Sequence, residues 1–116
     1  MDISIRQLQR VDVISLSGRL DASSSPELKR EIDALLDKGR ARLVLDLTNL
    51  ETLSSAGLRV IADARKRARA FKLTDLEGGD VRIAGPSKYI REVLDLTGFS
   101  TMLQIYDDTL SAVGSF

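Results

Sequence analysis

Strand-like and helix-like hydrophobic patterns alternate along this chain, and that alternation constrains its fold more than any other feature. Residues 3–8 and 11–17 alternate between two faces and predict two strands joined in a hairpin at Gln9 and Arg10. Residues 41–47, ARLVLDL, form a short apolar run, which is typical of a parallel strand buried on both faces. Shorter strand patterns follow at residues 81–85 and 102–106.

A first helix is predicted between residues 21 and 39. Its apolar positions lie on one face: Leu28, Ile32, Leu35 and Leu36. Pro26 suits the first turn of this helix, and Gly39 suits its end. Ser24 and Glu27 have the spacing of a capping box, although Ser25 is an equally good cap.

Three more helices follow. The second, over residues 55–71, has small or apolar inward positions that would let it lie close to the sheet: Gly57, Val60, Ile61, Ala64, Ala68 and Phe71. The third begins after Ser87 and ends at Gly98, and the fourth is capped by Asp107 or Asp108. Residues 73–80, LTDLEGGD, predict a loop with a Gly-Gly turn. This order predicts an α/β fold, a mixed sheet with helices packed against it, in one domain over residues 1–116.

Composition excludes several functions. The chain of 116 residues is 43% hydrophobic, with 17 Lys+Arg and 17 Asp+Glu, so it has a size suited to one core and no charge signature for nucleic acid. It contains no histidine and no cysteine. We therefore expect no enzyme, no metal site and no cofactor. The chain has no signal peptide pattern and no apolar run of about 18 residues, so we expect a cytoplasmic protein without membrane insertion.

Basic residues gather in the second helix and just after it: Arg59, Arg65, Lys66, Arg67, Arg69 and Lys72. A solvated helix face explains such a cluster. The alternative is a docking patch for an acidic partner.

Ser54 and Ser55 lie where the strand pattern of residues 41–47 gives way to the second helix. In open α/β sheets this edge binds ligands, and the amino end of a helix favours anions. The position therefore suits a phosphate, bound or covalent. The alternative is that one serine only caps the helix, which stabilises it by about 1 kcal/mol.

The segment DLTNLETLSSAGLRVI resembles the signature of STAS domains, specifically of the bacterial anti-sigma factor antagonists. LSGRLDASSSPEL near the start and VRIAGPSKYIREVLDLTGF near the end are similar to further segments of that family, in the same order. The resemblance covers most of the chain. It implies a STAS-like fold with a mixed sheet and a single STAS domain over residues 1–116.

In that family, a serine kinase that is also the anti-sigma factor phosphorylates one serine of the motif. Aligning Gly57 and Leu58 with the family's Gly-Leu places Ser55 at the phosphorylated position and Ala56 at the small residue after it. Ser54 stands where many members have aspartate, which leaves it as a second candidate acceptor. The predicted loop over residues 73–80 is also longer than the family's usual connection.

The resemblance implies a non-enzymatic regulator. The unphosphorylated protein would bind the anti-sigma factor kinase and release the sigma factor, phosphorylation would end binding, and a serine phosphatase would restore it. Asp21, which ends a Gly-Arg-Leu-Asp segment, is expected near Ser55, either as a positioning and partner-binding residue or as a turn residue. The expected partner-binding residues are Asp21, Ser54, Ser55, Ala56, Gly57 and Leu58.

Two alternatives remain. A constitutive STAS scaffold or transporter-associated subunit would bind its partner without phosphorylation, which the serine at position 54 leaves open. A receiver-like domain phosphorylated on Asp46 would need an acidic pair after the first strand to hold Mg²⁺, and SIRQLQR offers none. Asp46 is otherwise expected near the end of the central strand in a structural role.

Overall fold

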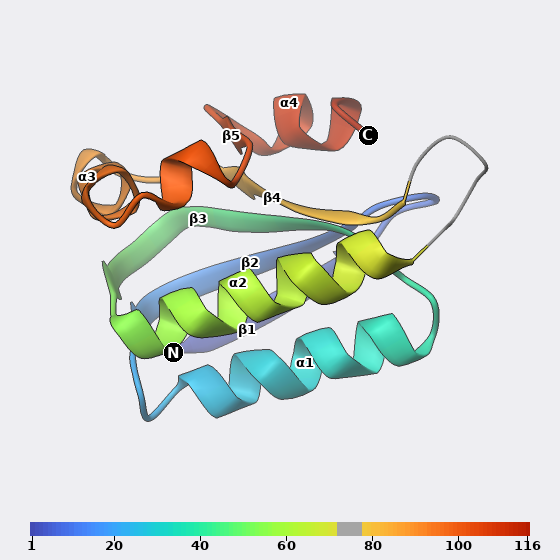
Figure 1. Ribbon diagram of the computed structural model, residues 1–116, viewed down its shortest axis with the longest axis horizontal. Coiled ribbons are helices and arrows are strands. Elements are labelled where there is room, and N and C mark those ends of the chain that lie inside the picture. Colours follow the sequence, from blue (N-terminus) through green and yellow to red (C-terminus); the bar gives the residue numbers. More distant parts are fainter. Residues whose placement is uncertain (72–77) are drawn as a thin grey trace.

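Five strands form one sheet whose spatial order equals the chain order, β1-β2-β3-β4-β5 (Figure 1). The structure, a computed structural model, describes residues 1–71 and 78–116. The strands are β1 (Asp2–Gln7), β2 (Asp12–Leu20), β3 (Arg42–Leu53), β4 (Asp80–Ala84) and β5 (Ile105–Tyr106). β1 is antiparallel to β2, and all other neighbours are parallel. The predicted α/β fold with a mixed sheet is confirmed.

Helices cover both faces of this sheet. They are α1 (Ser25–Asp37), α2 (Ser55–Ala70), α3 (Lys88–Leu96), the 3₁₀ turn η1 (Phe99–Thr101) and α4 (Thr109–Gly114). α1 and α2 run side by side over one face, and α4 lies over β4 and β5 (Figure 1). Ile14 and Leu16 of β2 belong to the main core with α1 and α2, whereas Val13 belongs to a smaller core with Ala112 of α4. The alternation predicted for this strand is therefore confirmed.

β3 is longer than the sequence predicted. It was expected to end at Leu47 and instead continues to Leu53, because the polar segment after Leu47 pairs with the second half of β2. Leu20 and Leu53 are the last register partners of this pairing, which contains two register shifts. The expectation that Asp46 lies near the end of the strand is therefore wrong, since Asp46 lies in its middle.

α1 lies within the predicted range of residues 21–39 but does not have the predicted cap. Pro26 lies in its first turn, and Gly39 follows its end with a φ of 77°. The capping box of Ser24 and Glu27 is wrong, because the Ser24 side chain accepts no hydrogen bond from the first turn. Its Oγ instead donates to the carbonyl oxygen of Arg19 at 2.8 Å and accepts the Asp21 N–H at 3.0 Å. The Ser24 hydroxyl therefore stabilises the turn before the helix and does not cap the helix itself.

The later elements follow the prediction with different bounds: β4 covers Asp80–Ala84 instead of residues 81–85, so Asp80 belongs to the strand and not to the predicted loop. Ser87 caps α3 by accepting the Ile90 N–H, and Asp108, rather than Asp107, caps α4. The last strand covers only Ile105–Tyr106 of the predicted residues 102–106. Of the loop predicted over residues 73–80, the part up to residue 77 lies outside the described residues. No helix in the described ranges combines the length and apolarity needed to cross a membrane.

Three basic residues of α2 form ion pairs with aspartates: Arg65, Arg67 and Arg69. Arg65 Nε and Arg69 Nη1 lie 3.6 and 4.0 Å from Oδ1 of the buried Asp80. Arg67 pairs with Asp33 of α1 and with Asp63 of its own helix. The predicted member Lys72 lies outside the described residues. The paired arginines therefore offer little attraction to an acidic partner, whereas Arg59 and Lys66 are exposed and have no ion pair within the described residues.

Candidate functional site

The carboxyl ends of β2 and β3 meet the amino ends of α1 and α2 at one edge of the sheet, on the left of Figure 1. The Ser54 N–H donates to the carbonyl oxygen of Leu20 at 2.9 Å, which joins the end of β2 to the start of α2. Asp21 follows Leu20 directly, and Ser55 follows Ser54. The structure therefore brings together the two segments that the sequence singled out.

Ser54 is the cap of α2. Its backbone is extended, with φ −92° and ψ 170°, and its Oγ accepts the Gly57 N–H at 3.3 Å. Its carbonyl oxygen accepts the Leu58 N–H at 3.0 Å. The first contact satisfies one of the N–H groups that a helix start leaves without a partner, and the second is the first regular backbone hydrogen bond of the helix. The Ser54 hydroxyl is thus half-buried and already engaged.

Ser55 is the first residue of α2 and is exposed. Its Oγ makes no hydrogen bond within the described part of the chain. The N–H groups of Ser55 and Ala56 likewise have no acceptor there, as is usual for the first turn of a helix. These two groups and the helix dipole make the surroundings of the Ser55 hydroxyl favourable to negative charge. The geometry fits a hydroxyl that an external enzyme can reach and modify.

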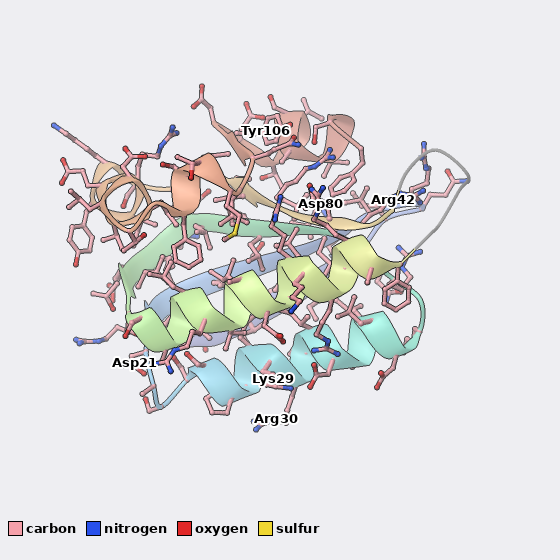
Figure 2. All side chains as sticks on the ribbon, in the orientation of Figure 1. Asp21, Lys29, Arg30, Arg42, Asp80 and Tyr106 are labelled. Carbon is pink, nitrogen blue, oxygen red and sulfur yellow. The ribbon has the colours of Figure 1, made fainter. Side chains whose placement is uncertain are left out.

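Asp21 lies in the loop between β2 and α1, close to the start of α2 (Figure 2). Its Oδ1 accepts the Ser23 Oγ–H at 2.7 Å, the Ser23 N–H at 3.0 Å and the Ser24 N–H at 3.2 Å. The hydrogen bonds from the Ser23 hydroxyl and the Ser24 N–H lower the pKa of Asp21 below its ordinary value. The result is a fixed, ionised carboxylate whose Oδ2 has no hydrogen-bond partner among the described residues.

Gly57 and Leu58 are buried, and Ala56 is half-buried. Leu58 belongs to the main core, and Gly57 lies against Leu20 of β2. The Leu58 side chain therefore holds the first turn of α2 against the sheet, and the absence of a side chain at Gly57 lets that turn approach Leu20 closely. Among the six residues expected to bind a partner, these two contribute to the position of Ser55 rather than to the exposed surface.

Asp46 lies away from this edge. Its Oδ2 accepts the Ser15 Oγ–H at 3.2 Å, and its Oδ1 accepts the Thr48 Oγ1–H at 2.6 Å. It lines a polar pocket of about 210 Å³ with Ser4, Arg6, Val13, Ser15 and Thr109. In the described ranges, no group of three or more His, Cys, Asp or Glu side chains could hold a metal ion. The surroundings of Asp46 thus lack the acidic cluster that a receiver-like acceptor needs.

The sequence pattern placed Arg59 in the basic cluster and gave no indication that it lies beside Ser55 on the helix surface. It is exposed and lies four residues after Ser55 on the same helix. Residues with this spacing are neighbours on a helix surface. The four-residue spacing between Ser55 and Arg59 within a predicted helix could have indicated this proximity from the sequence.

Comparison with known proteins gives a consistent result. A family model described as the STAS domain matches residues 2–112. The chain is 28% identical over 116 residues to a protein of Bordetella bronchiseptica assigned as the anti-sigma factor antagonist BtrV, covering 100% of this chain and 95% of that protein. It is 26% identical over 114 residues to the anti-sigma F factor antagonist of Paenibacillus polymyxa, covering 97% and 92%. A solved anti-sigma factor antagonist from Mycobacterium paratuberculosis has a TM-score of 0.82 at 26% identity, covering 98% and 92%.

Proposed function

Since the chain belongs to the STAS domain family, whose model matches residues 2–112, we propose that it is an anti-sigma factor antagonist switched by phosphorylation of Ser55. In this proposal the unphosphorylated protein binds an anti-sigma factor that is a serine kinase, and thereby releases the sigma factor. Phosphorylation ends this binding, and a serine phosphatase restores it. The protein acts in the cytoplasm as one domain over residues 1–116, and the ATP and Mg²⁺ belong to the kinase.

The observation that carries the proposal is the difference between the two serines. The Ser54 hydroxyl caps α2 through the Gly57 N–H, whereas the Ser55 hydroxyl is exposed and without a hydrogen bond in the described chain. A kinase can reach the second hydroxyl without breaking a contact within the domain. The Ser54 hydroxyl is half-buried, and a kinase would have to displace its contact with the Gly57 N–H to reach it. This contrast supports Ser55 as the acceptor and Ser54 as a structural residue.

The charge of a phosphate accounts for a switch at this position. A phosphoserine carries about −1.5 to −2 charges at pH 7. If the partner contact is dry, an unpaired charge in it costs about 3–5 kcal/mol, or about two to four orders of magnitude in affinity. Within the free domain, the same phosphate lies beside the unbonded N–H groups of Ser55 and Ala56. The modification can therefore end binding while the domain stays folded.

The test uses the serine kinase encoded nearest to this protein in its genome. The purified proteins are incubated with ATP and Mg²⁺, and the phosphate is located by mass spectrometry. We expect it on Ser55 and expect Ser55→Ala to remain unlabelled. Calorimetry then compares kinase binding by the wild type, Ser55→Asp and Ser54→Asp. The last variant is the matched control, because it adds the same charge one residue earlier and keeps a good cap.

We expect Ser55→Asp to lose binding and Ser54→Asp to retain it. Two results together would overturn the proposal: no phosphate on Ser55, and a Ser55→Asp variant that binds as the wild type does. They would favour the constitutive scaffold. Phosphate on Ser54 alone would move the acceptor to that residue.

A further inference from the structure

Arg59 differs from the other arginines of α2. Arg65, Arg67 and Arg69 each lie within 4.0 Å of an aspartate carboxylate. Arg59 is exposed and has no ion pair or hydrogen bond from its side chain within the described residues. Its guanidinium is thus a positive charge close to the candidate phosphorylation site and not committed to a carboxylate.

The helix places Arg59 next to Ser55. Residues four apart on an α-helix have Cβ atoms about 5–6 Å from each other, and both positions here lie within α2. The order is also the favourable one, since an acidic group four residues before a basic one stabilises a helix better than the reverse. A guanidinium can donate two parallel hydrogen bonds to phosphate oxygens.

Ser54 does not share this relation. It lies five residues before Arg59 and has an extended backbone outside the helix. Five residues correspond to about 500° of helix rotation, so a continued helix would place it about 140° away from Arg59 around the axis. A phosphate on Ser54 would therefore not face the guanidinium.

We propose that Arg59 clamps a phosphate on Ser55. The guanidinium donates to the phosphate oxygens, holds the group against the first turns of α2, and favours its doubly charged form. Before modification, the same side chain is free to contact the partner. Phosphorylation thus both adds negative charge at the contact and removes a positive one from it. This inference rests on the proposed function, because it assigns the residue that receives the phosphate group within the domain.

Other charged residues at this edge also influence such a phosphate. Arg19 and Glu51 are exposed near the ends of β2 and β3, and Asp21 lies in the loop after β2. Arg19 would favour the doubly charged form, and the two acidic residues would oppose it. All three stay unchanged in a comparison of variants at position 59. Their effects therefore cancel in the test.

The test installs phosphoserine at position 55 by genetic encoding, so that it needs no kinase. The titration of the phosphate is followed by ³¹P NMR in the otherwise wild-type protein and in the Arg59→Gln, Arg59→Lys and Lys66→Gln variants. Lys66 lies on the same helix at about 16 Å along the axis from Ser55. That distance exceeds the Debye length of about 10 Å at 0.1 M salt, so Lys66→Gln is the matched charge control.

We expect Arg59→Gln to raise the second pKa of the phosphate, ordinarily about 6, by roughly 0.3 unit. Arg59→Lys should give a smaller rise, and Lys66→Gln none. With phosphoserine at position 54, Arg59→Gln should raise the pKa of the phosphate by less than it does at position 55, because the guanidinium cannot face that phosphate. An unchanged titration of the position-55 phosphate in Arg59→Gln would overturn the clamp.

The two proposals fail separately. If no kinase modifies Ser55, the encoded phosphoserine still shows whether Arg59 binds it. If phosphorylation abolishes partner binding while Arg59→Gln leaves the second pKa of the phosphate unchanged, the proposed switch is supported and the Arg59 clamp is wrong.

Discussion

Gly57 lies so close to Leu20 that a Cβ atom added to Gly57 would stand 2.7 Å from Leu20 Cγ and 2.9 Å from Leu20 Cδ2. This contact joins the first turn of α2 to the end of β2. It sets how closely the residues before Gly57, including Ser55, approach the loop that contains Asp21. The position of the candidate site therefore depends on the absence of one methyl group.

Gly57→Ala should destabilise the protein, because the added methyl group forces Leu20 to move within a packed core. The expected loss is about 1–3 kcal/mol in the free energy of unfolding, measured by urea denaturation. Gly114→Ala is the control, since no atom lies within 4 Å of a Cβ at that position. If both variants unfold at the wild-type urea concentration, the close contact at Gly57 is wrong.

Ser54→Ala and Ser55→Ala should separate the two serine roles. Loss of the Ser54 cap should reduce the free energy of unfolding by about 1 kcal/mol, whereas Ser54→Asp should retain stability because aspartate also caps well. Ser55→Ala should change stability by less than about 0.5 kcal/mol, since its hydroxyl is exposed and makes no hydrogen bond in the described chain. Thermal and urea unfolding of the three variants would measure this. Equal losses at positions 54 and 55 would contradict the assignment.

The ionisation of Asp21 should make its contribution to stability depend on pH. The hydrogen bonds from the Ser23 hydroxyl and the Ser24 N–H lower its pKa in the folded state. Such a group stabilises the fold above its unfolded pKa of about 4, and this contribution is lost as the pH falls through the folded value. Asp21→Asn should therefore be less stable than the wild type at pH 7. The difference should shrink toward pH 2.

Carboxyl-detected NMR can measure the same pKa directly. Ser23→Ala removes the hydroxyl that lowers it most. The pKa of Asp21 should then rise. A titration near 4 in the wild type, unaffected by Ser23→Ala, would show that these hydrogen bonds do not form in solution.

Arg40 should be essential for stability because it neutralises Asp12, which is only 1% exposed. Its Nε and Nη2 donate to the two Asp12 oxygens at 2.8 and 2.9 Å. Arg40→Ala leaves the carboxylate buried without its cation and should cost about 3–5 kcal/mol in urea denaturation. Arg91→Ala removes half of an exposed ion pair with Asp95 and should cost less than about 1 kcal/mol. If Arg40→Ala and Arg91→Ala reduced the free energy of unfolding by a similar small amount, the fold would not depend on the ion pair between Arg40 and Asp12.

The order of strands and helices was predictable because hydrophobic periodicity is a local property. The alternation in β2 and the apolar stripe of α1 show which face of each element is buried. They can therefore be read without knowing which other elements form the core. The extension of β3 through residues 48–53 was not predictable in the same way. That segment is partly polar and becomes a strand only because the second half of β2 lies beside it.

The resemblance to STAS domains predicted the family and fold, and both are confirmed by the family match over residues 2–112. The expected cap of α1 was wrong for a reason of geometry. Ser24 has the right residue type and spacing. Its hydroxyl instead donates to the Arg19 carbonyl oxygen and accepts the Asp21 N–H, so it does not bond to the first turn of α1. A capping box describes one helix and takes no account of the strand that leads into it.

The sequence by itself determined the fold class, the family and the placement of two adjacent serines where a strand gives way to a helix. These depend on residue order, periodicity and motif. Only the tertiary structure decided which serine caps α2 and which is exposed, and that Arg59, unlike the other arginines of α2, has no ion pair with a carboxylate of the described residues. Those properties depend on which atoms come within about 3–4 Å of each other, and that is set by the packing of α2 against β2 and α1.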